Sequence, residues 1–233
     1  MAIGNVTPDS FYAPSRLNST DALIAWAKKA LDDGADILDI GACSTRPGST
    51  PVDENGEWLR LVPALTILKK ELPDTPLSLD TFRPEIARRA LEQFGPITIN
   101  DISGGCEEMY RLVEQHDVPY VFTFQGRYSN LGILNFTHTR NWILDPGLGF
   151  CGGVEEDYAC LRQLDSLRQY NRPVLVGVSR KSMIYKPLGL TQDTCLSATM
   201  AIQLYALEHG ATILRTHDVR ETREIIELFN RLV

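Results

Sequence analysis

The sequence lacks the features that mark membrane, secreted and nucleic-acid-binding proteins. It has no apolar run long enough to cross a bilayer and no signal-peptide pattern, so we expect a cytoplasmic protein with no membrane partner. Lys and Arg number 23 against 30 Asp and Glu, which gives a formal net charge of -7 and argues against a nucleic-acid partner. The five cysteines include no Cys-x-x-Cys pair, so we expect reduced thiols rather than a disulfide framework.

Linkers and low-complexity segments are absent as well, so no domain boundary is apparent. The chain has 233 residues, of which 43% are hydrophobic and 23% are charged. These values are ordinary for a globular protein with a sizeable core, and α/β barrels reach this length without splitting. We therefore predict a single domain over residues 1–233.

What the sequence does have is a repeated pattern in which a hydrophobic strand breaks into a polar cluster. This pattern is typical of a (β/α)8 TIM barrel, where the carboxyl ends of all strands converge on one active-site face. Residues far apart in the sequence are therefore expected to form one site. The runs are NVTPDSF (5–11), DIGACSTRPG (39–48), LSLDTFRP (77–84), ITINDISGG (97–105), ILDPGLGF (143–150), VGVSRKS (176–182) and ILRTHDV (213–219).

The predicted elements follow the same alternation, with one exception. Residues 125–141, between the fifth and sixth strands, carry no helical stripe, although a parallel crossover usually contains a helix. Either this connection is a bare loop or its helix is missing from the sequence, and the start of the chain inside the first strand also suggests trimming. Strands are expected at about 2–6, 36–41, 77–81, 97–101, 119–124, 142–146, 173–179 and 212–217, and helices at about 20–31, 54–71, 84–94, 106–116, 154–170, 191–209 and 219–232.

Acidic and amide side chains end three of the predicted strands, at Asp80, Asn100 and Asp145. A buried carboxylate is costly unless it is paired or hydrogen-bonded, so three such groups at one barrel mouth favour a polar ligand. Carboxylate and amide groups together supply acceptors and donors for the edge of a heterocycle. Taken singly, each residue could instead cap a helix or hold a loop.

Cations follow other strands, at Arg46, Lys181 and Arg215, with His217 two residues after Arg215. In an acidic protein they predict a local anion site, because Arg offers a planar fork and Lys a point charge to phosphate. The alternative is that each forms a salt bridge with an inward acid. Asn5, at the end of the first strand, could supply one oxygen to Mg²⁺, which needs few protein ligands.

Seven motifs in register, NVTPDSF, STRPG, SLDT, IND, DPGLGF, GVSRKS and RTHD, resemble those of the dihydropteroate synthase family of the pterin-binding TIM-barrel superfamily. The resemblance spans essentially the whole chain. It implies a folate-pathway transferase that condenses 6-hydroxymethyl-7,8-dihydropterin diphosphate with 4-aminobenzoate, giving 7,8-dihydropteroate and diphosphate. It also implies a homodimer formed through outer helices near the C-terminus.

The same resemblance implies a role for each candidate residue, and among them Asp80, Lys181, Thr45 and Arg46 are the expected catalytic groups. It assigns the pterin ring to Asp80, Asn100, Asp145 and Lys181, the diphosphate to Asn5, Arg215 and His217 with Mg²⁺ at Asn5, a closing loop to Thr45, Arg46 and Pro47, and the 4-aminobenzoate and sulfonamide site to Phe150, Lys181 and Ser182.

The sequence departs from the family pattern in three places. Cys151 and Gly152 stand where the family has Gly-Lys, Phe122-Thr123-Phe124 replaces a His-containing run, and the fifth helix has no counterpart. These departures leave a non-catalytic pterin-binding paralogue as an alternative. A methyltetrahydrofolate–corrinoid methyltransferase and a phosphate-binding barrel with another substrate are further alternatives.

Overall fold

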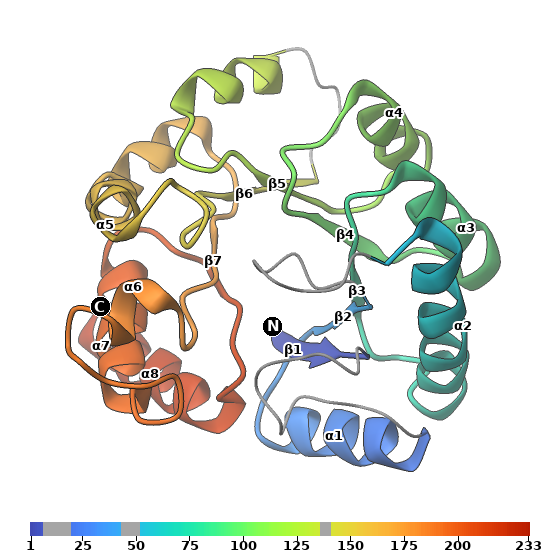
Figure 1. Cartoon of the computed structure of the whole chain (residues 1–233), viewed down its shortest axis with the longest axis horizontal. Coiled ribbons are helices and arrows are strands. Elements are labelled where there is room, and N and C mark those ends of the chain that lie inside the picture. Colours follow the sequence, from blue (N-terminus) through green and yellow to red (C-terminus); the bar gives the residue numbers. More distant parts are fainter. Residues whose placement is uncertain (7–19, 43–51, 136–140) are drawn as a thin grey trace. The chain divides into compact units, whose positions relative to one another are not determined.

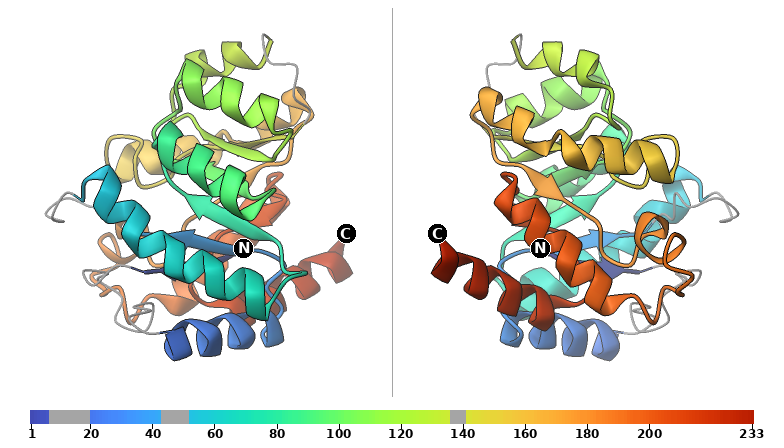
Figure 2. Two further views of the ribbon diagram at one scale, coloured as in Figure 1. Left: turned by 90° about the vertical axis from the view of Figure 1, so that its right-hand side faces the viewer. Right: turned by 90° about the vertical axis from the view of Figure 1, so that its left-hand side faces the viewer.

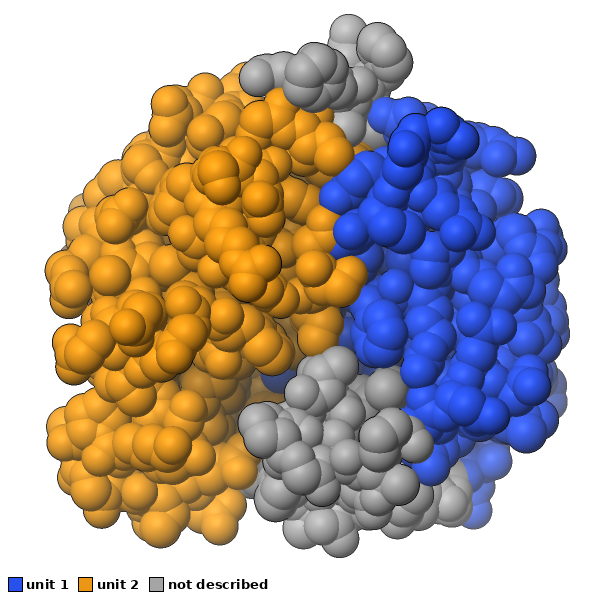
Figure 3. Space-filling model, turned by 45° about the horizontal axis from the view of Figure 1, so that its top comes forward, with its two compact units in different colours: residues 1–101, 105–120 blue, residues 102–104, 121–233 orange. Residues whose placement is uncertain are grey.

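The computed structural model describes residues 1–6, 20–42, 52–135 and 141–233. The chain divides into two compact units, shown in Figure 3. Unit 1 comprises Met1–Asp101 and Gly105–Tyr120, and unit 2 comprises Ile102–Gly104 and Val121–Val233. The expectation of one domain over residues 1–233 stays a prediction.

Unit 1 consists of parallel strands that are adjacent in sequence order and alternate with helices. Strands β1 to β4 pair in the order β1-β2-β3-β4, and helices α1 to α4 lie along their outer side (Figure 1). Nearly every strand residue is buried, which explains the continuous apolar runs in the sequence. The elements are β1 (Ala2–Asn5), α1 (Thr20–Asp32), β2 (Leu38–Gly41), α2 (Glu54–Glu71), β3 (Leu77–Asp80), α3 (Pro84–Phe94), β4 (Thr98–Asp101) and α4 (Glu107–Gln115).

Helix α2 shows how the sequence specifies these helices. Asp53 Oδ1 accepts a hydrogen bond from the N–H of Gly56 at 2.8 Å, which caps the first turn. Leu61, Leu65 and Leu68 are fully buried at helical spacing and face the strands. The opposite face is charged, and none of the helices that the structure describes is long and apolar enough to cross a membrane.

Unit 2 continues the alternation with parallel strands and less regular helices. β7 and β8 form a two-stranded sheet of their own, while Leu144 of β6 makes an isolated parallel bridge to Val174. Helices α7 and α8 lie side by side (Figure 2). The elements are β5 (Tyr120–Thr123), η2 (Tyr128–Asn135), β6 (Trp142–Asp145), α5 (Val154–Arg162), η3 (Leu164–Tyr170), β7 (Leu175–Val176), α6 (Ser182–Tyr185), α7 (Leu196–Glu208), β8 (Ile213–Leu214) and α8 (Val219–Leu232).

The structure corrects the prediction in unit 2 at several points. The connection predicted either to be a bare loop or to have lost its helix contains the 3₁₀ segment η2, in which Leu131 is buried and Tyr128 packs against Phe124. The helix predicted at 154–170 is divided into α5 and the 3₁₀ segment η3, where buried Leu164 and Leu167 have the three-residue spacing of that helix type. The short helix α6 was not predicted, and β7 and β8 are shorter than the strands predicted at 173–179 and 212–217.

Candidate active site

The carboxyl ends of the strands in unit 1 carry a row of residues in register. Asn5 of β1 pairs with Gly41 of β2, Gly41 with Asp80 of β3, and Asp80 with Asn100 of β4. Register partners in neighbouring parallel strands place their side chains on the same face. Gly41 packs closely in this row, because a Cβ there would lie 3.2 Å from the Cβ of Asp80. Along the row, the side chains are therefore an amide at Asn5, none at Gly41, a carboxylate at Asp80 and a second amide at Asn100.

The amide of Asn100 is oriented by Asp39, a residue that sequence reasoning did not single out. Asn100 Nδ2 donates to Asp39 Oδ2 at 3.1 Å, and both side chains are buried. Because a carboxylate only accepts, this bond directs the oxygen of Asn100 away from Asp39. No described residue donates to that oxygen, so it has no hydrogen-bond partner within the described part of the chain. Asp39 could have been found in the sequence as an acidic residue two positions before the end of the apolar strand β2.

Asp145, at the end of β6 in unit 2, is held through both carboxylate oxygens. Oδ1 accepts from the backbone N–H of Gly147 at 2.8 Å, and Oδ2 accepts from Thr123 Oγ1 at 3.2 Å. Burial raises the pKa of Asp145 above its usual value, while Lys181 and the Gly147 N–H act in the opposite direction. Thr123 was noted in the sequence only as a departure from the family pattern. Here it fixes the plane of a candidate substrate-binding carboxylate.

Lys181 lies beside Asp145 in unit 2. Its ammonium donates to the carbonyl oxygen of Leu148 and lies 5.0 Å from the centroid of the Phe150 ring. Burial lowers the pKa of Lys181 to about 8; Asp145 opposes this shift and Arg215 adds to it. A lysine whose pKa is near neutrality is typical of functional sites.

The loop that carries Phe150 is held by a buried acid of helix α5. Asp157 Oδ1 accepts from the N–H of Gly149 at 2.7 Å and from the N–H of Cys151 at 3.3 Å. The N–H of Phe150 donates to Gly147 O at 2.8 Å, and the Phe150 side chain is 40% exposed. The loop thus presents an aromatic ring at the surface of unit 2. Asp157 was not identified from the sequence, because nothing local distinguishes it from its acidic neighbours.

The cations predicted after β7 and β8 gather in unit 2. A Cβ placed on Gly177 would lie 3.7 Å from Arg215 Cβ and 4.0 Å from Lys181 Nζ, so both basic side chains lie beside this glycine. The N–H of His217 donates to Ser179 Oγ at 3.1 Å. The local anion site expected from the sequence thus has two of its cations together.

Four further candidates were predicted from the sequence. Ser182 begins helix α6, directly after Lys181. Thr45, Arg46 and Pro47 lie outside the described residues. The functional roles of all these side chains stay predictions.

The donor set bears on the expected Mg²⁺. No group of three or more His, Cys, Asp or Glu side chains in the described part of the chain could hold a metal ion. Asn5 offers one amide oxygen from a partly buried position at the end of β1. This set fits an ion that takes its other ligands from water and a substrate diphosphate, as Mg²⁺ commonly does.

A hollow of about 1020 Å³ in unit 2 lies away from these groups. It is lined by residues just before β7 and β8, such as Val174 and Thr212, and by Leu207 and Phe229 of the outer helices. Active sites of α/β barrels form at the carboxyl ends of the strands, so this hollow at the opposite ends is not the candidate site.

Parallel strands that end in carboxylate and amide groups and are followed by basic loop residues are typical of α/β-barrel enzymes, and the comparisons specify the class. The sequence matches the family described as pterin binding enzyme over residues 1–133 and 136–217. Dihydropteroate synthase of Synechocystis sp. is 36% identical over 259 residues, covering 100% of this chain and 89% of that protein. Dihydropteroate synthase of Bacillus subtilis is 32% identical over 252 residues, covering 100% and 88%.

Solved structures agree with the sequence matches. The dihydropteroate synthase of Clostridium difficile, crystallised with pteroic acid, superposes with a TM-score of 0.89 at 32% identity, covering 100% of this chain and 95% of that one. The Xanthomonas albilineans enzyme with 4-aminobenzoic acid gives 0.88 at 30%, covering 100% and 92%. The chain therefore belongs to the dihydropteroate synthase family. The predicted TIM-barrel class is confirmed, and neither the corrinoid methyltransferase nor the non-catalytic paralogue is favoured.

Proposed function

We propose that this protein catalyses the condensation of 6-hydroxymethyl-7,8-dihydropterin diphosphate with 4-aminobenzoate to give 7,8-dihydropteroate and diphosphate. The observation that carries the proposal is the geometry of Asp145, whose carboxylate is fixed by Gly147 and Thr123 beside the ammonium of Lys181. The structures of relatives with pteroic acid and 4-aminobenzoic acid support the same reaction.

The pterin ring would be recognised through its hydrogen-bonding edge. Asp145 accepts from the exocyclic amine and the adjacent ring N–H, and the oriented oxygen of Asn100 accepts from another ring donor. Asp80, beside Asn100 in the register, supplies a further acceptor, while Lys181 donates to a ring acceptor. A ring with N–H groups on one edge and acceptors on the other matches this set.

The chemical step needs stabilisation of a departing anion more than acid–base catalysis. The bond between the exocyclic methylene carbon and the diphosphate oxygen breaks, leaving its electron pair on diphosphate and positive charge that the ring delocalises. Arg215 and His217 bind the diphosphate as its negative charge develops. Mg²⁺, held at the diphosphate with Asn5 as its protein ligand, would supply further charge neutralisation. The aniline nitrogen then forms the new C–N bond and loses a proton to solvent.

The second substrate would bind beside Phe150. Its aromatic ring packs on Phe150, its carboxylate approaches Ser182 at the start of α6, and Lys181 lies between the two substrates. The resemblance to the family assigns a closing loop to Thr45, Arg46 and Pro47, which lie outside the described residues. Asp80 and Lys181 complete the proposed catalytic set with Thr45 and Arg46. Sulfonamides, which have the shape of 4-aminobenzoate, compete for this position.

A cytoplasmic homodimer is part of the proposal. The four cysteines described, Cys106, Cys151, Cys160 and Cys195, are all thiols, as in reducing compartments. Leu228 and Leu232 of α8 are 48% and 66% exposed, an apolar surface that a second copy could cover. Light scattering after size exclusion measures the mass, and a monomer at micromolar concentration would contradict the dimer.

The experiment that tests the function is a coupled assay of product and diphosphate. The purified chain is incubated with the pterin diphosphate, 4-aminobenzoate and Mg²⁺, and both products are quantified, with Asp145→Ala as the inactive control. Equal amounts of dihydropteroate and diphosphate from the wild-type chain support the proposal. A folded chain that binds the pterin diphosphate without turnover contradicts it and identifies the binding paralogue.

A further inference from the structure

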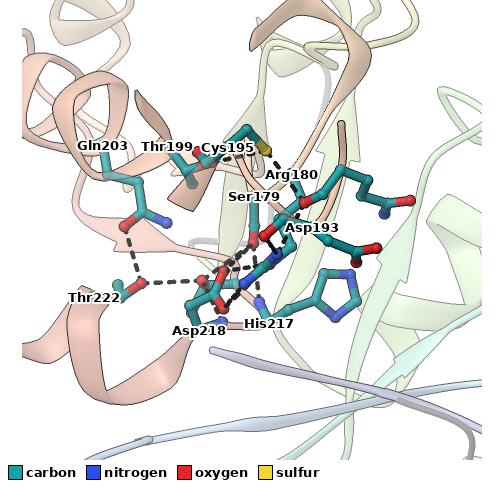
Figure 4. A network of polar contacts seen from close by, with 11 residues as sticks. Ser179, Arg180, Asp193, Cys195, Thr199, Gln203, His217, Asp218 and Thr222 are labelled. Atoms are coloured by element: carbon teal, nitrogen blue, oxygen red, sulfur yellow. Dashed lines mark hydrogen bonds and ion pairs between the residues drawn. The ribbon is translucent and has the colours of Figure 1, made fainter. Parts of the chain in front are cut away.

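A buried ion pair in unit 2 joins the two segments that carry Lys181 and His217 (Figure 4). Arg180 immediately precedes Lys181, and Asp218 immediately follows His217. The two paired side chains are only 7% and 9% exposed. A charged pair withdrawn from water to this extent needs close geometry and further hydrogen bonds to be tolerated.

The guanidinium of Arg180 has these bonds. Nε donates to both carboxylate oxygens of Asp218, at 3.2 and 2.9 Å, and Nη2 donates to Oδ1 at 2.7 Å. Nη1 donates to the carbonyl oxygens of Gln192 at 2.8 Å and Asp193 at 3.2 Å. Arg180 therefore connects the loop after β7, the segment before α7 and the loop after β8. With each guanidinium nitrogen engaged in this way, its role is within the protein rather than at a substrate.

Hydroxyl groups extend the connection to the backbone of His217. Ser179 Oγ accepts from the N–H of His217 at 3.1 Å and donates to Asp218 Oδ2 at 3.5 Å. Thr216 Oγ1 accepts from the N–H of Asp218 at 3.0 Å. The positions of His217 and of its flanking residues are thus set by bonds to the same cluster. Thr222 and Gln203 continue it into α8 and α7.

The backbone at Arg180 gives independent evidence that the pair holds the segment before Lys181. Arg180 has a φ of 55°, a left-handed conformation that L residues with a Cβ avoid. Such conformations persist where surrounding contacts enforce them, and they concentrate at functional sites. A buried ion pair is by itself weak evidence for stability, since apolar pairs often replace it without loss. The pair lies next to two candidate ligand-binding residues, Lys181 and His217, which favours a role in positioning their side chains.

We infer that Arg180 and Asp218 are positioning residues for the transfer reaction. The pair sets the location of the Lys181 ammonium relative to the pterin ring and of the His217 imidazole relative to the diphosphate, without touching the substrate. This inference rests on the proposed function, because it concerns the efficiency of that reaction.

Chemical rescue of Arg180→Ala tests the inference. The substitution leaves a space shaped for guanidinium opposite Asp218, so added guanidinium ion can restore the pair, whereas uncharged urea of similar shape cannot. We expect kcat/KM to fall about 100-fold, the size of effect that a displacement of about 1 Å produces, and guanidinium at non-denaturing concentration to recover at least about tenfold. Circular dichroism confirms that the variant is folded at the assay temperature.

Two further variants control for charge and for folding. Asp218→Asn should lose activity to a similar extent and gain nothing from guanidinium, because its carboxylate is gone. Glu227→Gln removes an exposed ion-pair carboxylate of helix α8, which Asp218 precedes, and should stay within about twofold of wild type. Where Arg180→Ala does not fold, Arg180→Lys replaces it, and wild-type kinetics in that folded variant would overturn the inference.

The outcomes separate this inference from the proposed function. A wild-type chain that forms no dihydropteroate overturns the function and the inference together. An active wild type, with Arg180→Ala and Asp218→Asn unchanged or with guanidinium and urea acting alike, overturns the inference alone.

Discussion

Lys181 combines three properties that are rarely found in one surface lysine. Its ammonium donates a hydrogen bond to the carbonyl oxygen of Leu148 and lies near the Phe150 ring, and burial lowers its pKa to about 8. Both protonation states are therefore populated within a narrow range above neutral pH. Turnover of a substrate that needs the charged form of Lys181 will therefore depend on pH in that range.

The first prediction concerns the pH dependence of turnover. Since the proposed role of Lys181 needs its proton, kcat/KM should fall about tenfold per pH unit above about 8. Lys181→Arg, which stays charged, should abolish this decline below pH 10, and Lys181→Met should show a low, flat profile. A wild-type decline that persists in both variants would assign it to another group.

The same pKa shift has a consequence for stability. The folded state holds the Lys181 proton less tightly than the unfolded chain, so unfolding takes up a proton between pH 8 and the usual pKa of 10.5. The contribution of Lys181 to the free energy of unfolding therefore increases as pH rises through that range. Urea denaturation of wild type and Lys181→Met at pH 7.5 and 9.5 measures this contribution. The free energy of unfolding of wild type should rise relative to that of Lys181→Met at the higher pH.

The second prediction tests close packing at Gly4 of β1. A Cβ at this position would lie 2.5 Å from the indole of Trp26 on α1, a contact that requires the ring to move. We expect Gly4→Ala to lower the free energy of unfolding by about 1–3 kcal/mol, as overpacking does. Gly132→Ala, where a Cβ meets nothing within 4 Å, is the matched control and should change it by less than about 0.5 kcal/mol. Equal effects in urea denaturation would contradict the packing argument.

At the level of elements, the first turn of α5 organises the loop that follows β6. Asp157 is 3% exposed, and its carboxylate accepts from the N–H groups on either side of Phe150. A negative charge at a helix N-terminus is favourable in itself. Here the Asp157 carboxylate also accepts from loop N–H groups that would otherwise be unpaired. The position of the Phe150 ring thus depends on a helix rather than on its own loop.

The third prediction follows from this dependence. Asp157→Leu leaves the N–H groups of Gly149 and Cys151 without their acceptor and should lower the free energy of unfolding by about 1–3 kcal/mol. The KM for 4-aminobenzoate should rise more than the KM for the pterin diphosphate, because Phe150 is proposed to contact only the former. Steady-state kinetics with each substrate varied gives both values. Glu155→Gln, at an exposed position in the same turn, is the control, and an equal rise in both KM values would contradict the assignment.

At the scale of the whole molecule, each unit contributes a different kind of chemistry. Unit 1 carries neutral amides and a carboxylate in one register row, with Asn5 as the candidate magnesium ligand. Unit 2 carries the basic groups and Asp145. The proposed Mg²⁺ would therefore bind with the substrate's diphosphate, and the fold would not depend on it.

The fourth prediction separates these two roles of a metal. A chelator should lower turnover more than tenfold, and added Mg²⁺ should restore it, because the departing diphosphate loses its counter-ion. The melting temperature without substrate should stay within about 1 °C, since a metal that binds only together with the substrate's diphosphate cannot stabilise the substrate-free protein. Scanning calorimetry with and without chelator measures this, and a large shift would instead indicate a structural metal site.

By itself, the sequence determined the order of elements and where the chemical groups stand along the chain. Apolar runs and helical stripes depend on local hydrophobicity, so α2 and α3 were predicted at their observed bounds, and Asn5, Asp80, Asn100 and Asp145 at strand ends. The 3₁₀ segments η2 and η3 and the helix α6 were missed. Their formation depends on which apolar side chains become buried, and that is not a local property.

Only the tertiary structure decided how the candidate groups are held. Asp39 and Asn100 are 61 residues apart, Thr123 and Asp145 are 22 apart, and Arg180 and Asp218 are 38 apart. Hydrogen bonds over such separations require strand register and loop conformation, which no local pattern encodes. The pKa of Lys181 likewise depends on burial by residues distant in sequence. The candidate substrate-binding residues could thus be named from the sequence, whereas their orientation and protonation arise from packing.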